Sequence, residues 1–114
     1  MATINPERSQ VSVNMEKIFW ETLTTGDTAG YCLPQGVGSL AGSVQVTGTF
    51  GGATVVLEGS NDGTNYVTLT DITGFPISLT AAGLVDFSTA CAYVRPAISG
   101  GSSDDVDVTV ILRN

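Results

Sequence analysis

Three carboxylates near the end of the chain come closest to the spacing of a chemical site. They are Asp104, Asp105 and Asp107, and they follow Ser102 and Ser103. With backbone carbonyls these side chains could surround a Ca²⁺ ion, which prefers a full shell of oxygen ligands. A complete ligand set cannot be counted in this stretch. The favoured interpretation is therefore a solvated turn that leads into a strand.

The stretch Asn61-Asp62-Gly63-Thr64-Asn65 also has the outline of a calcium loop. It lacks the glutamate that supplies two ligand oxygens at the end of such loops. Asn, Asp and Gly are equally the residues that form tight turns. The stretch is therefore predicted to be a type I turn closed by Gly63 in the left-handed conformation.

The groups needed for nucleophilic catalysis are missing. The chain has no histidine, so a Ser-His-Asp or Cys-His arrangement cannot form within it. Cys32 and Cys91 have no basic neighbour in the sequence that would lower a thiol pKa. Both are interpreted as buried small hydrophobes, and a disulfide between them is left open. We expect a protein that is not an enzyme and that holds no metal and no cofactor.

Composition narrows the classes of partner. The 114 residues fit one domain, and four basic residues stand against eleven acidic ones, a net charge of −7. This balance argues against nucleic acid, whose affinity comes largely from neutralised phosphates, and against anionic membranes. No apolar run is long enough for a membrane helix, and no secretion signal is visible. We expect a protein that is made and kept in a cytoplasm, or one that leaves it by a route that needs no such signal.

Charge is unusually sparse. Charged residues make up 13% of the chain, against about 25% in typical soluble domains. Residues 28–57 and 72–85 contain none. Two interpretations stay open: a small β domain solvated by its hydroxyls, or a surface partly covered by neighbouring subunits.

Short alternating runs recur between Gly, Asn and Asp clusters, which is typical of β-sandwiches. The prediction is a single all-β domain over residues 17–114, an antiparallel sandwich of the jelly-roll-like or Ig-like kind, preceded by an extended N-terminal arm over residues 1–16. The arm is either a disordered terminus or a segment that a neighbouring subunit orders.

The clearest pattern predicts a three-stranded meander over residues 43–70. Gly51-Gly52 suits a two-residue hairpin turn, which places Val46 opposite Leu57. A three-residue loop at the next turn places Leu57 opposite Val67 and keeps the apolar faces matched.

The remaining segments are predicted as follows. Residues 17–24 form a strand, with a helix as the alternative. Further strands are expected at 28–33, 77–80, 84–87, 93–98 and 106–112, with a Gly-rich loop over 35–42. Pro96 lacks an N–H, so its strand lies at an edge or carries a bulge.

Apolar residues on faces that should be polar mark candidate contacts with other subunits. These are Phe19, Leu23, Val56 and Ile111. Four aromatic residues are candidates for a sugar-binding platform, although each is more often a core or hairpin residue: Trp20, Tyr31, Tyr66 and Tyr93.

Three motifs in order, at residues 45–52, 57–69 and 93–96, carry a resemblance to a known family. They read QVTGTFGG, LEGSNDGTNYVTL and YVRP. The chain resembles, over about residues 17–113, small virion proteins of tailed bacteriophages, the β-sandwich head-decoration or cement-like proteins. The resemblance implies a virion protein, assembled in the host cytoplasm, that binds the outside of the capsid, often as a homotrimer, and clamps subunits of the major capsid protein. A tail or baseplate location is the alternative within this family.

A second, partial resemblance joins residues 59–66 to residues 93–95. It is to discoidin-type, galactose-binding-like jelly rolls, which implies a carbohydrate- or lipid-binding module. The chain is shorter than those modules, and its turn residues have a structural explanation.

Overall fold

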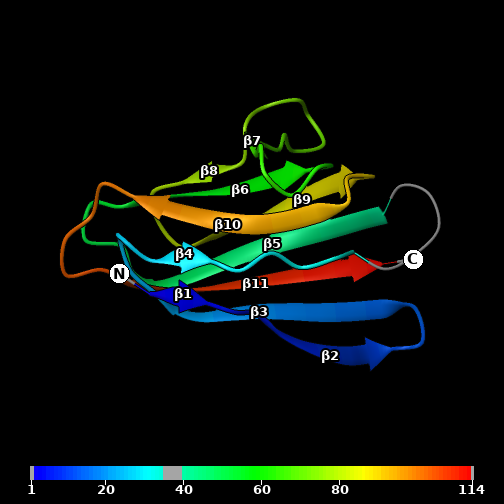
Figure 1. Cartoon of the computed structure of the whole chain (residues 1–114), viewed down its shortest axis with the longest axis horizontal. Helices are drawn as coiled ribbons and strands as arrows, with labels where there is room; N and C mark the ends of the chain where they lie inside the picture. The colour runs from blue at the N-terminus through cyan, green and yellow to red at the C-terminus, as the bar shows by residue number, and fades with distance from the viewer. Residues whose placement is uncertain (1, 35–39, 114) are drawn as a thin grey trace.

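The computed structural model describes residues 2–34 and 40–113, which fold into a β-sandwich with no helix among them (Figure 1). The described strands are β1 Thr3–Ile4, β2 Glu7–Ser12, β3 Met15–Leu23, β4 Thr28–Ala29, β5 Leu40–Thr49, β6 Thr54–Ser60, β7 Val67–Thr68, β8 Ser78–Leu79, β9 Gly83–Thr89, β10 Tyr93–Ser99 and β11 Asp105–Arg113. One sheet has the order β2-β3-β11-β5-β9. The other has the order β10-β6-β7, with β8 also paired to β6, and β1 pairs with β4. The all-β sandwich is confirmed.

The core lies between the two sheets and follows the alternation of side chains along each strand. On β11, Val106, Val108 and Val110 are buried, while Asp107 and Thr109 between them are only partly so. The last strand of the chain is thus central to its sheet, between β3 and β5. The apolar residues of β11 therefore point into the core, and the residues between them point to the open face of the sheet.

The predicted hairpin of residues 43–60 is wrong. The turn itself is present, because Gly51 and Gly52 have φ of 56° and 85° and the Ala53 N–H donates to the Phe50 carbonyl over 2.8 Å. Beyond it the strands separate: β5 pairs with β11 and β9, and β6 with β10, β7 and β8. The turn carries the chain from one sheet to the other. Matched apolar faces arise equally in a hairpin and in two strands that face each other across a core, so the pattern could not separate them.

The second turn of the predicted meander is partly right. β6 and β7 are antiparallel, as predicted, and the Leu69 N–H donates to the Leu57 carbonyl over 2.9 Å. Gly59 pairs with Val67, however, which places the register two residues away from the predicted one. The prediction therefore put the side chains of β6 and β7 on the correct faces but paired the wrong residues, because the connecting loop is longer than three residues.

Strand β3 confirms the strand predicted over residues 17–24, but it contains a β-bulge. Trp20 pairs with Val108 and Leu23 with Val106, so β3 has one residue more than β11 between these pairs. Thr22 sits in the bulge with φ of 61°. The extra residue turns Leu23 inward, onto the same side as Trp20. Leu23, predicted as an interface residue, is fully buried in the core.

The N-terminal segment is built into the sandwich where the structure describes it. β1 pairs with β4, and β2 forms a hairpin with β3. The expectation of a separate arm over residues 1–16 is corrected for residues 2–16. Every residue of β2 is nevertheless exposed, so this strand extends the sheet beyond the core rather than covering it.

The other predicted strands map onto described elements. Residues 28–33 contain β4 and a single bridge between Cys32 and Val94; β8, β9 and β11 match the strands predicted at 77–80, 84–87 and 106–112. β10 is the last strand of its sheet, which confirms the edge position deduced from Pro96. Of the loop predicted over residues 35–42, residues 35–39 lie outside the described part, and residues 40–42 begin β5. Among residues 2–34 and 40–113 no helix could span a lipid bilayer.

Candidate functional site

Two of the three carboxylates of residues 104–107, those of Asp104 and Asp107, bind the protein's own backbone. Asp104 accepts the Thr25 N–H at 3.1 Å and the Thr25 hydroxyl, and Asp107 accepts the N–H of the bulged Thr22 at 2.9 Å. The Thr25 hydroxyl is the main reason why the pKa of Asp104 lies below its usual value. In the described part of the chain, no three His, Cys, Asp or Glu side chains are grouped to hold a metal ion. Asp104 and Asp107 therefore act as structural clamps, and Asp104 is buried rather than part of the predicted solvated turn. Asp105 is exposed.

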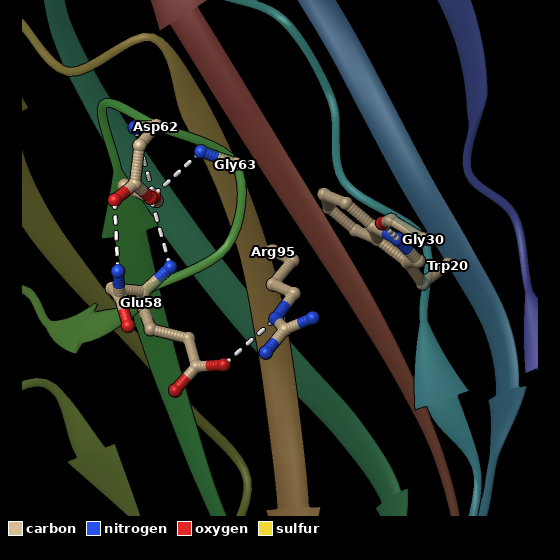
Figure 2. A network of polar contacts seen from close by, with 8 residues as sticks. Trp20, Gly30, Glu58, Asp62, Gly63 and Arg95 are labelled. Atoms are coloured by element: carbon tan, nitrogen blue, oxygen red, sulfur yellow. Dashed lines mark hydrogen bonds and ion pairs between the residues drawn. The ribbon is translucent and has the colours of Figure 1, made fainter.

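Asp62 plays the same part in the β6–β7 loop (Figure 2). Its carboxylate accepts the Thr64 and Asn65 N–H groups at 2.8 Å and the Ser60 hydroxyl at 2.9 Å. These donors, Asn65 first, hold the pKa of Asp62 well below its usual range. Gly63 has φ of 78°. The left-handed conformation predicted for Gly63 is confirmed, but the loop between Ser60 and Val67 is longer than the predicted three-residue type I turn.

The two cysteines are free thiols. Cys32 is buried in the core, and this burial raises its pKa to about 12. A thiol of that pKa has almost no thiolate at neutral pH and is a poor nucleophile. Cys91 is half-buried and lies 3.3 Å from the Tyr93 carbonyl oxygen.

The four predicted interface residues do not come together. Phe19 and Ile111 are half-buried on the outer face of the five-stranded sheet, Val56 is half-buried on the outer face of the other sheet, and Leu23 is in the core. Only Phe19 and Ile111 share a surface.

That surface is called here the outer sheet face: the outward residues of β3, β11, β5 and β9. One register row across it joins Phe19, Thr109, Gln45 and Leu84, and the next joins Lys17, Ile111, Ser43 and Asp86. Leu84 is 59% exposed. Strand β5, in the middle of the face, has no charged residue. Beside it, Ile72 and Ile111 line a depression of about 440 Å³.

The aromatic residues separate into one core residue and one cluster. Trp20 is buried and donates its Nε1–H to the Gly30 carbonyl over 2.7 Å, so it cannot be a platform (Figure 2). The three tyrosines gather around Arg95. Its guanidinium lies 3.7 Å from the centre of the Tyr66 ring, and Tyr31 meets Tyr93 edge to face with ring centres 4.9 Å apart.

Tyr31, Tyr66 and Arg95 line a groove of about 590 Å³ between the N-terminal strands and the edge strand β10, called here the arginine groove. Its other lining residues are Thr3, Asn5, Pro6, Arg8, Thr28, Ala29, Gly30, Cys32, Leu33 and Gly63. Two of the chain's three arginines therefore lie in one groove.

Each arginine of the groove has a carboxylate partner. Arg8 pairs with Glu16 at 2.6 Å and also donates to the Leu33 carbonyl, and Arg95 pairs with Glu58 at 2.8 Å (Figure 2). The Tyr66 hydroxyl is buried, and no hydrogen-bond partner for it lies in the described part of the chain. Arg95 could have been noticed from the alternation along its strand, but Arg8 stands in a segment without periodicity and gave no signal.

Comparison of the chain with models of known protein families, with curated proteins and with solved structures found no match. Its function is therefore argued from its own geometry and from the motif resemblance.

Proposed function

We propose that this chain is a non-enzymatic structural protein of a virus particle, which binds the outer surface of the capsid and stabilises it. In this proposal it acts as a homo-oligomer, a trimer, and its partners are the major capsid protein and its own copies. The resemblance of its three motifs to phage decoration proteins supports this assignment. So do the structural roles of Asp62, Asp104 and Asp107 and the buried thiol of Cys32, because these groups are already used in the fold.

The outer sheet face is the observation that carries the proposal. The open face of an antiparallel sandwich is normally polar. Here Phe19, Ile111 and the exposed Leu84 interrupt it, and β5 between them adds no charge. These apolar residues are interspersed with Thr109, Gln45 and Ser43. Apolar surface gathered on one face is the feature that marks a candidate protein contact.

In the two register rows of this face the charged residues, Lys17 and Asp86, lie on β3 and β9. The part of the rows on β11 and β5 therefore needs little desolvation of charge when it is covered.

The free edge of the same sheet is a weaker candidate for contact. β2 has an open edge, but Arg8 points from it toward the core side and is held by Glu16. Inward-pointing charge on an edge strand discourages the addition of another strand. We therefore place the contact on the face and not on the edge.

Point substitutions test this better than removal of residues 1–16, because that deletion would also remove β2 from its sheet. Phe19→Asp and Ile111→Asp place a charge on the outer sheet face. Val56→Asp, a half-buried apolar residue on the opposite face, is the matched control. The measurements are the mass in solution by light scattering and co-sedimentation with tailed-phage capsids stripped of their decoration protein.

The wild-type chain and Val56→Asp should form a closed oligomer and sediment with capsids, and the two outer-face variants should do neither. A monomer that never sediments with capsids would contradict the proposal. Binding to isolated tails but not to heads would overturn the capsid location. Equal loss in Val56→Asp would remove the outer sheet face from the argument.

A further inference from the structure

The connection between β7 and β8 presents two large apolar side chains to solvent. Ile72 and Phe75 are each 69% exposed, and residues 72–85 contain no charge. Apolar residues scattered singly over a surface are ordinary, but two of them close together in one short loop mark a candidate contact. Residues 71–75 are called here the apolar loop.

The apolar loop is held in one conformation by its own hydrogen bonds. The Asp71 carboxylate accepts the Thr73 and Phe75 N–H groups at 2.9 and 3.0 Å, and the Asp71 N–H donates to the Phe75 carbonyl over 2.7 Å. The Ile72 N–H donates to the Asp86 carbonyl over 3.2 Å, which fixes the loop to the end strand β9. A loop that is ordered before binding loses little conformational entropy when a partner covers it.

The arginine groove offers a surface that complements the loop. Tyr31 and Leu33 line the groove and are both exposed. Each of its two arginines is paired with a glutamate, so these four charges sum to zero. Tyrosine and arginine are enriched among the residues that anchor protein contacts. A groove with balanced charges and exposed apolar side chains suits an uncharged apolar segment, and the apolar loop provides one.

The apolar loop and the arginine groove lie on opposite sides of the sandwich (Figure 1). The five-stranded sheet ends in β2 on one side and in β9 on the other, and the second sheet runs from β10 to β7. Residues of β1, β2 and β10 line the groove, whereas the loop is bonded to β9. A contact between loop and groove must therefore join different copies. Because it joins two different patches, repeating it can close a ring.

We propose that the apolar loop of one copy docks in the arginine groove of the next, with Phe75 as the anchor against Tyr31 and Leu33. This inference rests on the proposed homo-oligomer and assigns the head-to-tail contact that closes it. The loop adjoins the outer sheet face, because Ile72 and Ile111 line the same depression. Ile111→Asp, expected above to lose the oligomer, places its charge beside this contact.

The first test compares three single variants of the full chain by light scattering. Phe75→Asp charges the loop, and Tyr31→Asp charges the groove. Each should weaken self-association about thirtyfold or more, as expected for an anchor residue of an interface. Val13→Asp is the matched control, because Val13 is an exposed apolar residue in the β2–β3 turn that belongs to neither patch. It should associate as the wild type does.

The second test mixes the two defective chains. The Phe75→Asp chain keeps its groove and the Tyr31→Asp chain keeps its loop, so one contact can still form between them. Unlabelled Tyr31→Asp chain added to ¹⁵N-labelled Phe75→Asp chain should shift the amide signals of residues 30–33 and 63–66. Unlabelled Phe75→Asp chain, whose loop is charged, should not shift them. A dispersed amide spectrum of each variant alone shows that it is folded.

Several results would overturn the proposal: both variants form the wild-type oligomer, the mixture shifts no groove signals, or Phe75→Asp keeps the oligomer and loses only capsid binding, which would make the capsid protein the partner of the loop. A wild-type chain that stays monomeric would overturn this contact together with the proposed oligomer. If the oligomer depends on Phe75 but does not sediment with stripped capsids, the contact stands and the proposed function falls.

Discussion

Two polar regions of this sandwich differ in what their side chains do. One is the bulge end, formed by residues 22–27 with Asp104 and Asp107, and the other is the arginine groove. At the bulge end, the carboxylates are occupied by the N–H and hydroxyl groups of Thr22 and Thr25. In the groove, the buried hydroxyl of Tyr66 has no partner among the residues that the structure describes. A cluster that is conspicuous in the sequence is thus used for folding, whereas the open site is assembled from residues far apart in the chain.

The largest effect is expected where the bulge turns a side chain inward. Leu23→Ala should lower the free energy of unfolding by about 2–5 kcal/mol, because Leu23 is fully buried and the small residue leaves a cavity. Phe19→Ala, on the half-buried outer face, should cost clearly less. Urea denaturation of both measures the difference. Equal losses would mean that the bulge does not place Leu23 in the core.

Gly48 tests how tightly the bulge end is packed. It has φ of 116°, and a Cβ there would overlap the Asp105 carbonyl and stand 3.0 Å from the Val106 Cα. Gly48→Ala should therefore destabilise by about 1–3 kcal/mol, a typical range for a residue forced into a disfavoured conformation.

Gly26→Ala is the control, because Gly26 has φ of 100° with nothing near its Cβ position. It should cost roughly 1 kcal/mol, from the backbone alone. Thermal unfolding compares the two. If Gly26→Ala cost as much as Gly48→Ala, close packing would not be the cause.

Acid should weaken the clamped turns. The pKa values of Asp27, Asp62, Asp71 and Asp104 all lie below 3.8 in the folded chain, and hydrogen bonds from threonine or asparagine are the first cause of each. A lowered folded pKa gives stability that is present above the unfolded value and is lost as the pH falls through the folded one.

The melting temperature should therefore fall below about pH 5 and keep falling toward the lowered folded pKa values. Asp104→Asn should be less stable at pH 7 and show a smaller further loss in acid. A melting curve measured at pH 7, 5, 4 and 3 tests both statements. A variant as acid-sensitive as the wild type would exclude Asp104 as a contributor.

The smallest effect is expected in the groove. Tyr66→Phe removes a hydroxyl that has no hydrogen bond within residues 2–34 and 40–113, so stability should stay within about 1 kcal/mol of the wild type or rise slightly. Urea denaturation measures this. A large loss of stability would show that the hydroxyl has a partner in the folded protein. The groove would then resemble the bulge end, where the polar side chains are used in the fold.

The sequence predicted strand type well and strand partners poorly. Alternation along residues 106–112 identifies a strand, and the missing N–H of Pro96 places another at an edge, because both signals are local. The separation of β5 from β6 has no local signal in the sequence. The apolar residues on either side of Gly51 match equally well in a hairpin and in two strands that face each other across the core. The bulge at Thr22 places Leu23 on the opposite face from the predicted one. The residue types at positions 20–23 do not indicate that the strand contains a bulge.

The candidate site was predicted in part. Tyr31 and Tyr66 could be named as aromatic candidates, but their assembly with Arg8 depends on β2, which has no apolar alternation because both its faces are exposed. The periodicity of apolar residues arises from burial of one face, so it cannot identify a strand that is held by backbone pairing alone.

The edge strand β10 has a consequence for many copies held close together. Val94 uses its outward N–H and carbonyl on Cys32, and Pro96, the next residue directed to the same side, has no N–H to offer. Two successive positions on this rim are therefore closed to a strand from another molecule. Chains of this protein can be concentrated on a surface without fusing along β10 into a continuous ribbon.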